Sequence, residues 1–219
     1  MGPFPGNLRG HFEDLDFVEI HQEALRRLRL PEDGLLAEGG PFALPPSAIT
    51  AVRECIAARQ ASNRPWGFKD PRTTLFIESW HALLPAASWL FLFRNPFQVI
   101  DSLRRRGDVI ARESPSEALR VWIHYNSLIL DFVYQHPGQT RLCELGKAED
   151  VWVPLFRRVL ERLGLQPIHS FSCYEPGLLG EETDIPLEVR PYLRAEAAEL
   201  YRQLQATARV QQRPLASIP

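Results

Sequence analysis

The segment SWLFLFRNPFQVIDSLRRR, residues 88–106, places an arginine where a predicted strand is followed by a predicted helix. Five consecutive apolar side chains in 89–93 predict a strand of a parallel sheet, buried on both faces. Asn95 and Pro96 predict the cap and first residue of the next helix. The carboxyl edge of such a sheet and a helix N-terminus both attract anions. Arg94 is therefore a candidate anion ligand; the alternative is a structural ion pair.

A second segment, WGFKDPRTTLFIESWHALLP at residues 66–85, has a similar organisation. Its pattern predicts a short strand that ends at Lys69, followed by an acidic residue, a proline, an arginine and a helix. Asp70 precedes a proline and lies near Arg72, which is typical of a paired turn residue. The two segments therefore both place a basic side chain at the end of a predicted strand.

The order Lys-Asp-Pro-Arg, a helix with Trp80, Leu-Pro, an apolar strand, Arg-Asn-Pro and then Ser-Leu before a basic cluster resembles the bacterial branch of the sulfotransferase family. These proteins transfer a sulfuryl group from 3'-phosphoadenosine 5'-phosphosulfate. In that family the Arg and the Ser eight residues later hold the 3'-phosphate of this donor, which implies these roles for Arg94 and Ser102. The resemblance covers residues 6–165 and is most specific over 66–106.

The resemblance implies an α/β fold of the P-loop NTPase type, in which helices flank a parallel sheet. The sequence agrees with this fold because predicted strands and helices alternate along one domain that spans residues 1–219. The strands are expected near 66–69, 88–93 and 140–145, and the helices near 14–30, 47–62, 73–84, 96–106, 115–135, 149–163 and 188–208.

The chain departs from the family in one respect. Family members begin with a strand and a glycine-rich loop, Gly-x-x-Arg-Ser-Gly-Thr, whose backbone amides hold the 5'-phosphosulfate. The sequence contains no such run, so we expect the first strand and this loop to be missing and catalysis by this chain alone to be impaired. Two alternatives follow: a truncated sulfotransferase, or a non-catalytic binding or scaffold protein that retains affinity for adenosine 3',5'-bisphosphate.

The candidate catalytic residues also depend on the resemblance. Eukaryotic members place a catalytic histidine two residues after a strand-end lysine, and Pro71 occupies that position here. Bacterial members suggest a carboxylate, which implies Glu13, with His11 beside it. Lys69 would stabilise charge on the oxygen that bridges sulfur and phosphorus. The alternatives are a first-turn helix acid for Glu13 and a surface lysine for Lys69.

Local patterns give further expectations. Leu15, Val18, Leu25 and Leu28 have helical spacing and predict the buried face of the first helix. Ser47 is expected to cap the second helix. The glycine- and proline-rich residues 168–187 are expected to form a loop suited to a lid or an acceptor wall.

Composition limits the class of protein. The chain has 219 residues, 45% of them hydrophobic, and a net charge of −2, which argues against a nucleic-acid partner. Three scattered cysteines, Cys55, Cys143 and Cys173, predict free thiols rather than a disulfide framework or a metal site. Because no apolar run reaches membrane length, we expect a cytoplasmic protein that acts on a small-molecule acceptor without a membrane partner. A homo-oligomer stays an open alternative.

Overall fold

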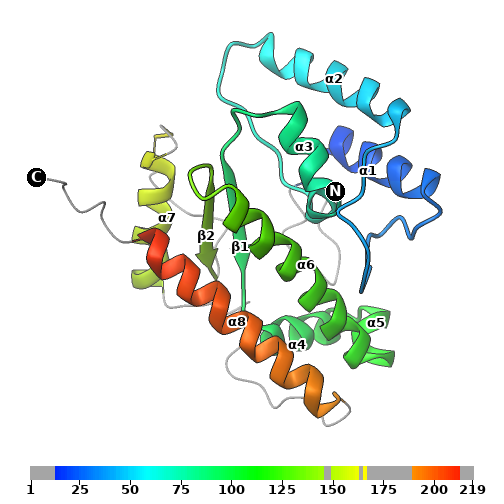
Figure 1. Ribbon diagram of the computed structural model, residues 1–219, viewed down its shortest axis with the longest axis vertical. Coiled ribbons are helices and arrows are strands. Elements are labelled where there is room, and N and C mark those ends of the chain that lie inside the picture. The colour runs from blue at the N-terminus through cyan, green and yellow to red at the C-terminus, as the bar shows by residue number, and fades with distance from the viewer. Residues whose placement is uncertain (1–12, 146–148, 163–164, 167–188, 213–219) are drawn as a thin grey trace, which may run out of the picture. The chain divides into compact units, whose positions relative to one another are not determined.

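The computed structural model describes residues 13–145, 149–162, 165–166 and 189–212 (Figure 1). These residues form a mixed α/β structure that is mostly helical, with a small parallel sheet of two strands. The chain divides into two compact units, Met1–Pro85 and Ala86–Pro219, each of which is described by itself below. The single domain over 1–219 stays a prediction.

The first unit is helical. Its described part, residues 13–85, contains α1 (Leu15–Arg27), α2 (Pro46–Gln60), the 3₁₀-helix η1 (Pro71–Phe76) and α3 (Ile77–Leu83). The side chain of Asp14 caps α1 by accepting a hydrogen bond from the backbone N–H of Asp16 at 3.1 Å. The expected helix over 73–84 is thus present as a 3₁₀ turn that continues into a short α-helix.

The buried face of α1 differs from the predicted one. Val18 and Leu25 are buried as expected, but Leu15 is 59% exposed and Leu28 is 37% exposed. Both lie at the ends of the helix, where its neighbours no longer cover it. The buried residues of α1 are Phe17, Val18, Ile20, His21, Ala24 and Leu25.

The start of α2 also differs from the predicted one. The helix begins at Pro46, its N-cap residue is Pro45, and no side chain caps it, so the prediction that Ser47 caps this helix is wrong. Proline has the backbone φ of a first helical turn already fixed and lacks the N–H that a cap would satisfy. The proline pair therefore starts the helix before Ser47 is reached.

The predicted strand at 66–69 is wrong. These residues have no regular secondary structure, and no segment in the described ranges pairs with them. Phe68 is held instead by ring stacking on Phe17, with the ring centroids 3.9 Å apart. A strand requires a hydrogen-bonded neighbour, so an apolar pattern alone does not produce one.

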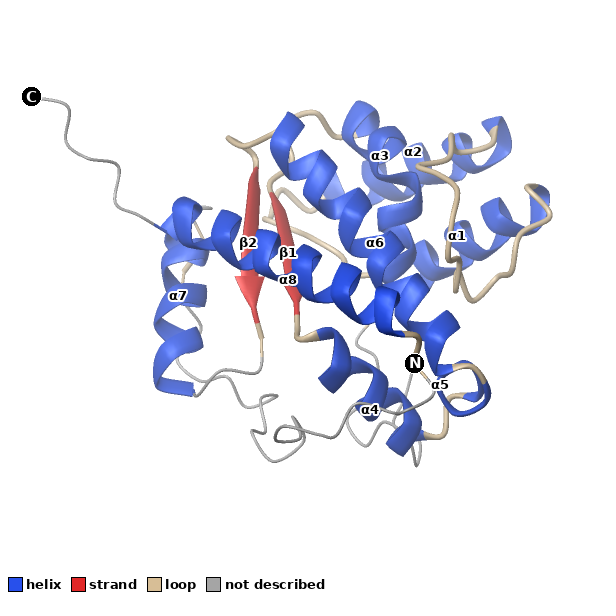
Figure 2. Cartoon of the chain, turned by 60° about the horizontal axis from the view of Figure 1, so that its bottom comes forward, coloured by secondary structure: helices blue, strands red, loops and turns tan. Residues whose placement is uncertain are grey.

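The second unit contains the sheet. Strands β1 (Trp89–Phe93) and β2 (Thr140–Glu144) are parallel and in register from Trp89 opposite Thr140 to Phe93 opposite Glu144, which confirms both predicted strands. Figure 2 shows α8 crossing one face of this pair. The helices are α4 (Pro96–Arg106), α5 (Val109–Glu113), α6 (Pro115–Gln135), α7 (Glu149–Arg162) and α8 (Pro191–Gln212).

Helices of this unit bury one face of β1. Phe91 meets Phe132 of α6 edge-on at 6.1 Å, and Phe93 meets Tyr201 of α8 edge-on at 6.1 Å. Leu92, which points the other way, is 47% exposed, so the expectation that β1 is buried on both faces is wrong. The apolar run identified the strand correctly, but α6 and α8 cover only one of its faces.

Most other helix predictions are confirmed. The helix expected near 188–208 is present as α8 and buries four apolar residues at helical spacing, namely Leu193, Ala197, Leu200 and Leu204. Cys55 is half-buried, Cys143 is buried, and both are free thiols, while Cys173 and the expected loop at 168–187 lie outside the described residues. None of the helices in the described ranges has the length and apolar character needed to cross a membrane.

Candidate functional site

Arg94 follows β1 directly and precedes the cap of α4. The Asn95 Oδ1 atom accepts a hydrogen bond from the backbone N–H of Phe97 at 2.9 Å, which confirms the predicted cap. Arg94 is half-buried, and so is Ser102 in the second turn of α4. The second unit therefore contains a guanidinium at the carboxyl edge of a parallel strand pair, beside the N-terminus of a helix of 11 residues.

Glu144 ends the neighbouring strand at the same edge. Its carboxylate accepts hydrogen bonds from the Tyr201 hydroxyl and, at 2.8 Å, from the side-chain amide of Gln205. Burial raises the pKa of Tyr201, the hydrogen bond to Glu144 raises it further, and the charge of Arg94 acts in the opposite direction. Arg94 and Glu144 thus both act on the Tyr201 hydroxyl. Sequence reasoning missed Glu144, although a carboxylate at the end of a predicted strand was a visible signal.

In the first unit, the structure brings Glu13 and Lys69 together. The Lys69 Nζ atom donates to Glu13 Oε1 at 2.9 Å, and Arg72 Nη2 lies 3.7 Å from Glu13 Oε2. The Glu13 side chain is 7% exposed, whereas that of Lys69 is 55% exposed. Two residues 56 positions apart in the sequence are therefore joined as an ion pair. The third predicted catalytic residue, His11, lies outside the described residues.

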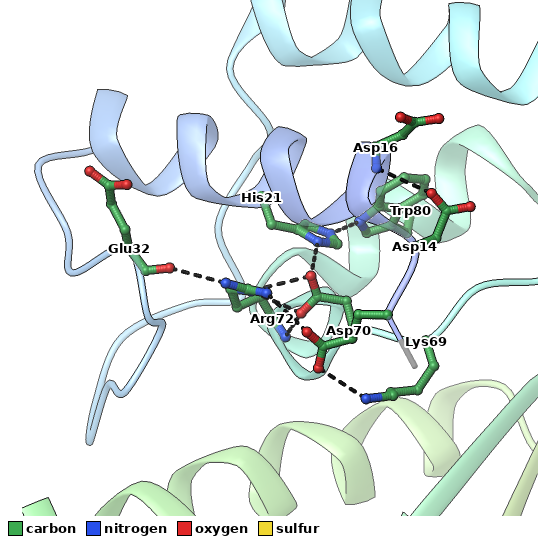
Figure 3. A network of polar contacts seen from close by, with 9 residues as sticks. Asp14, Asp16, His21, Glu32, Lys69, Asp70, Arg72 and Trp80 are labelled. Carbon is green, nitrogen blue, oxygen red and sulfur yellow. Dashed lines mark hydrogen bonds and ion pairs between the residues drawn. The ribbon is translucent and has the colours of Figure 1, made fainter. Parts of the chain in front are cut away.

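Asp70, which follows Lys69 in the chain, belongs to a buried polar network with His21 and Arg72 (Figure 3). It accepts from the backbone N–H of Arg72 and from Arg72 Nε, both at 2.9 Å, and its Oδ2 atom lies 3.1 Å from His21 Nδ1. Burial alone would raise the pKa of Asp70, but the hydrogen bonds from His21 and Arg72 outweigh it and lower the pKa to about 2. Asp70 is thus a paired turn residue that caps η1.

His21 completes the network. It is fully buried on α1, and its Nε2 atom lies 2.8 Å from the indole Nε1 of Trp80. Sequence reasoning missed His21. The available signal was a single polar side chain one residue after Ile20 and three before Ala24, on the apolar face of the helix.

The predicted ligands and the predicted catalytic pair belong to different units. Arg94 and Ser102 are in the second unit and can bind an anion through charge-assisted and neutral hydrogen bonds. Glu13 and Lys69 are in the first, where a carboxylate and an ammonium can accept and donate a proton. In the described ranges, no group of three or more His, Cys, Asp or Glu side chains could hold a metal ion.

Comparison of the chain with protein-family models, with curated proteins and with solved structures gives no significant match.

Proposed function

We propose that this chain is a sulfotransferase-family protein with a P-loop NTPase-like fold, and that it binds the nucleotide part of 3'-phosphoadenosine 5'-phosphosulfate. One observation carries the proposal: Arg94 lies between the end of β1 and the capped start of α4, beside a parallel neighbour strand. Anionic ligands of open α/β sheets bind at this position. The resemblance of residues 66–106 to the bacterial members supplies the identity of the ligand.

In this proposal, Arg94 and Ser102 hold the 3'-phosphate. A guanidinium can bind two phosphate oxygens at once, and such charge-assisted hydrogen bonds contribute about 1.5–3 kcal/mol each. The Ser102 hydroxyl adds a weaker neutral donor. The dipole of α4 adds partial positive charge at the same edge, which favours a dianionic group.

The acceptor is a hydroxyl or an amine of a small molecule in the cytoplasm. Its oxygen or nitrogen attacks sulfur, the bond from sulfur to the bridging oxygen breaks, and adenosine 3',5'-bisphosphate leaves with that oxygen. Glu13, with His11 beside it, takes the acceptor proton, and Lys69 stabilises the negative charge on the leaving oxygen. Because Lys69 Nζ lies 2.9 Å from Glu13, the acceptor must displace or share this ammonium.

The second candidate is a binding or scaffold protein without catalysis. The contacts of Glu13 favour it, because Lys69 and Arg72 both face this carboxylate and its side chain is only 7% exposed. A carboxylate held in this way can serve packing alone. Both candidates share nucleotide binding at Arg94 and differ in whether sulfate is transferred.

Calorimetric titration with adenosine 3',5'-bisphosphate tests the shared claim. Arg94→Ala should weaken binding about tenfold or more, because a charged hydrogen-bond donor is lost. Arg53→Ala, which removes an exposed arginine of α2, is the matched control and should leave the affinity unchanged. Equal affinities of wild type and Arg94→Ala would refute the proposed site.

A further inference from the structure

Two arginines from separate segments converge on one exposed tyrosine hydroxyl in the second unit. Tyr192, in the first turn of α8, is 51% exposed. Its hydroxyl oxygen accepts from Arg120 Nη2 of α6 at 3.0 Å and from Arg190 Nη1, just before α8, at 3.5 Å. This arrangement lies outside the group around Arg94 and has no role in the proposed reaction.

The two guanidinium groups and the Tyr192 hydroxyl present hydrogen-bond donors to solvent. A guanidinium has five N–H donors and no acceptor, so each arginine keeps further donors after its bond to Tyr192. The tyrosine oxygen already accepts twice, which leaves its own O–H to donate outward. A tetrahedral oxyanion, which only accepts hydrogen bonds, is the chemical complement of such a surface.

Nearby carboxylates neutralise this cluster only weakly. Among the described residues, the carboxylate nearest to Arg120 is that of Glu117, with 3.9 Å between Nε and Oε2 and a side chain that is 49% exposed, and that of Glu196 acts on Arg120 from farther away. In the described ranges Arg190 has no ion pair. Hydrogen bonds from Arg190 and Arg120 lower the pKa of Tyr192.

We propose that Arg120, Arg190 and Tyr192 form a surface site for a phosphate or sulfate group. The two guanidinium groups bind the oxyanion from two sides, and the Tyr192 hydroxyl donates to a third oxygen. Because all three side chains are exposed, salt screens the attraction and the affinity should be in the millimolar range. This inference does not depend on the function proposed above.

Nuclear magnetic resonance titration of the full chain with inorganic phosphate tests the site, with chloride exchanged to keep the ionic strength constant. The Arg190 side-chain signals and the Tyr192 ring signals should shift together and saturate. Arg190→Ala should weaken phosphate binding about tenfold, since it removes a charged donor. Arg202→Ala removes an exposed arginine of α8 that is paired with Glu199, and it should leave the affinity for phosphate unchanged.

The controls separate this site from others and identify the source of the anion. Arg94→Ala should leave the shifts at Tyr192 intact. Equal affinity for inorganic phosphate and for a phosphotyrosine peptide would indicate that the natural ligand is a free anion. Tighter binding of the peptide would indicate that the ligand is a phosphate group on another protein. Both results support the site. Shifts that do not saturate, or that are the same in Arg190→Ala as in Arg202→Ala, would overturn it.

Discussion

The indole N–H of Trp80 points at Nε2 of His21 across 2.8 Å, and this contact fixes the protonation of the buried imidazole. An indole nitrogen can only donate, so Nε2 must be the acceptor and the ring proton is on Nδ1. Nδ1 then donates to Asp70 at 3.1 Å. The buried network of the first unit therefore runs from a neutral donor through a neutral histidine to an ionised carboxylate.

Trp80→Phe should destabilise the first unit beyond the effect of lost packing. The variant leaves the buried Nε2 of His21 without a hydrogen-bond donor, which costs about 1–3 kcal/mol. Urea unfolding followed by circular dichroism measures the free energy of unfolding of the variant and of wild type. Trp66→Phe is the control, because Trp66 is only half-buried and its ring lies 6.2 Å from that of Phe17. Equal destabilisation by the two variants would contradict the proposed role of the hydrogen bond.

Asp70 should make the stability of the chain depend on pH in acid. Its folded-state pKa is about 2, below the ordinary value of 3.8, so the ionised group stabilises the folded state above about pH 4. This contribution, about 2 kcal/mol, is lost as pH falls toward 2. The free energy of unfolding of Asp70→Asn should therefore be lower than that of wild type at neutral pH and approach it in acid.

Asp33→Asn serves as the control for this experiment. Asp33 accepts a hydrogen bond from the backbone of Leu35 at an exposed position. The free energy of unfolding of Asp33→Asn should depend on pH in the same way as that of wild type. If the difference in the free energy of unfolding between wild type and Asp70→Asn stays constant from pH 6 to pH 2, Asp70 acts by packing and not by charge.

Glu13→Gln should separate catalysis from nucleotide binding. Loss of a general base lowers rates by about 10²–10⁴-fold. The nucleotide site proposed at Arg94 does not include Glu13, so the affinity for adenosine 3',5'-bisphosphate should not change. The measurement is transfer of labelled sulfate to alcohols and amines, with Glu19→Gln, an exposed glutamate of α1, as the control. If wild type transfers sulfate and Glu13→Gln transfers it equally fast, Glu13 is not the base.

Backbone amides of β1 should alternate in hydrogen-exchange protection. The N–H of Trp89 donates to the carbonyl of Gln139 beside β2 at 2.8 Å, so those of Phe91 and Phe93 also point toward β2. The N–H groups of Leu90 and Leu92 point to the other edge, where no strand in the described ranges pairs with them. They should exchange faster in a dilute monomer. Uniform protection of all five would mean that a further strand completes the sheet.

The sequence was sufficient to predict elements whose determinants are local. Asn95 and Pro96 specify the start of α4 within a few residues, and the apolar run before Arg94 identifies β1. The failed strand at 66–69 depends on a partner that its own residues cannot specify. Exposure of Leu92 likewise depends on which face the helices cover, a property of the assembled unit.

The candidate site residues show the same difference between local and long-range determinants. The resemblance named Glu13 and Lys69 separately, and their contact at 2.9 Å arises from packing between segments far apart in the chain. His21 was missed because its two partners, Trp80 and Asp70, lie 59 and 49 residues away. Long-range polar pairs of this kind leave no periodic signal in a single sequence.

The most direct test of the proposed nucleotide site is its selectivity for the 3'-phosphate. Calorimetry should show that the wild-type chain binds adenosine 3',5'-bisphosphate about tenfold or more tightly than adenosine 5'-monophosphate, because only the former has the 3'-phosphate that Arg94 and Ser102 are proposed to hold. Arg94→Ala should bind the two nucleotides with nearly equal affinity. Equal affinities in the wild-type chain would contradict the account.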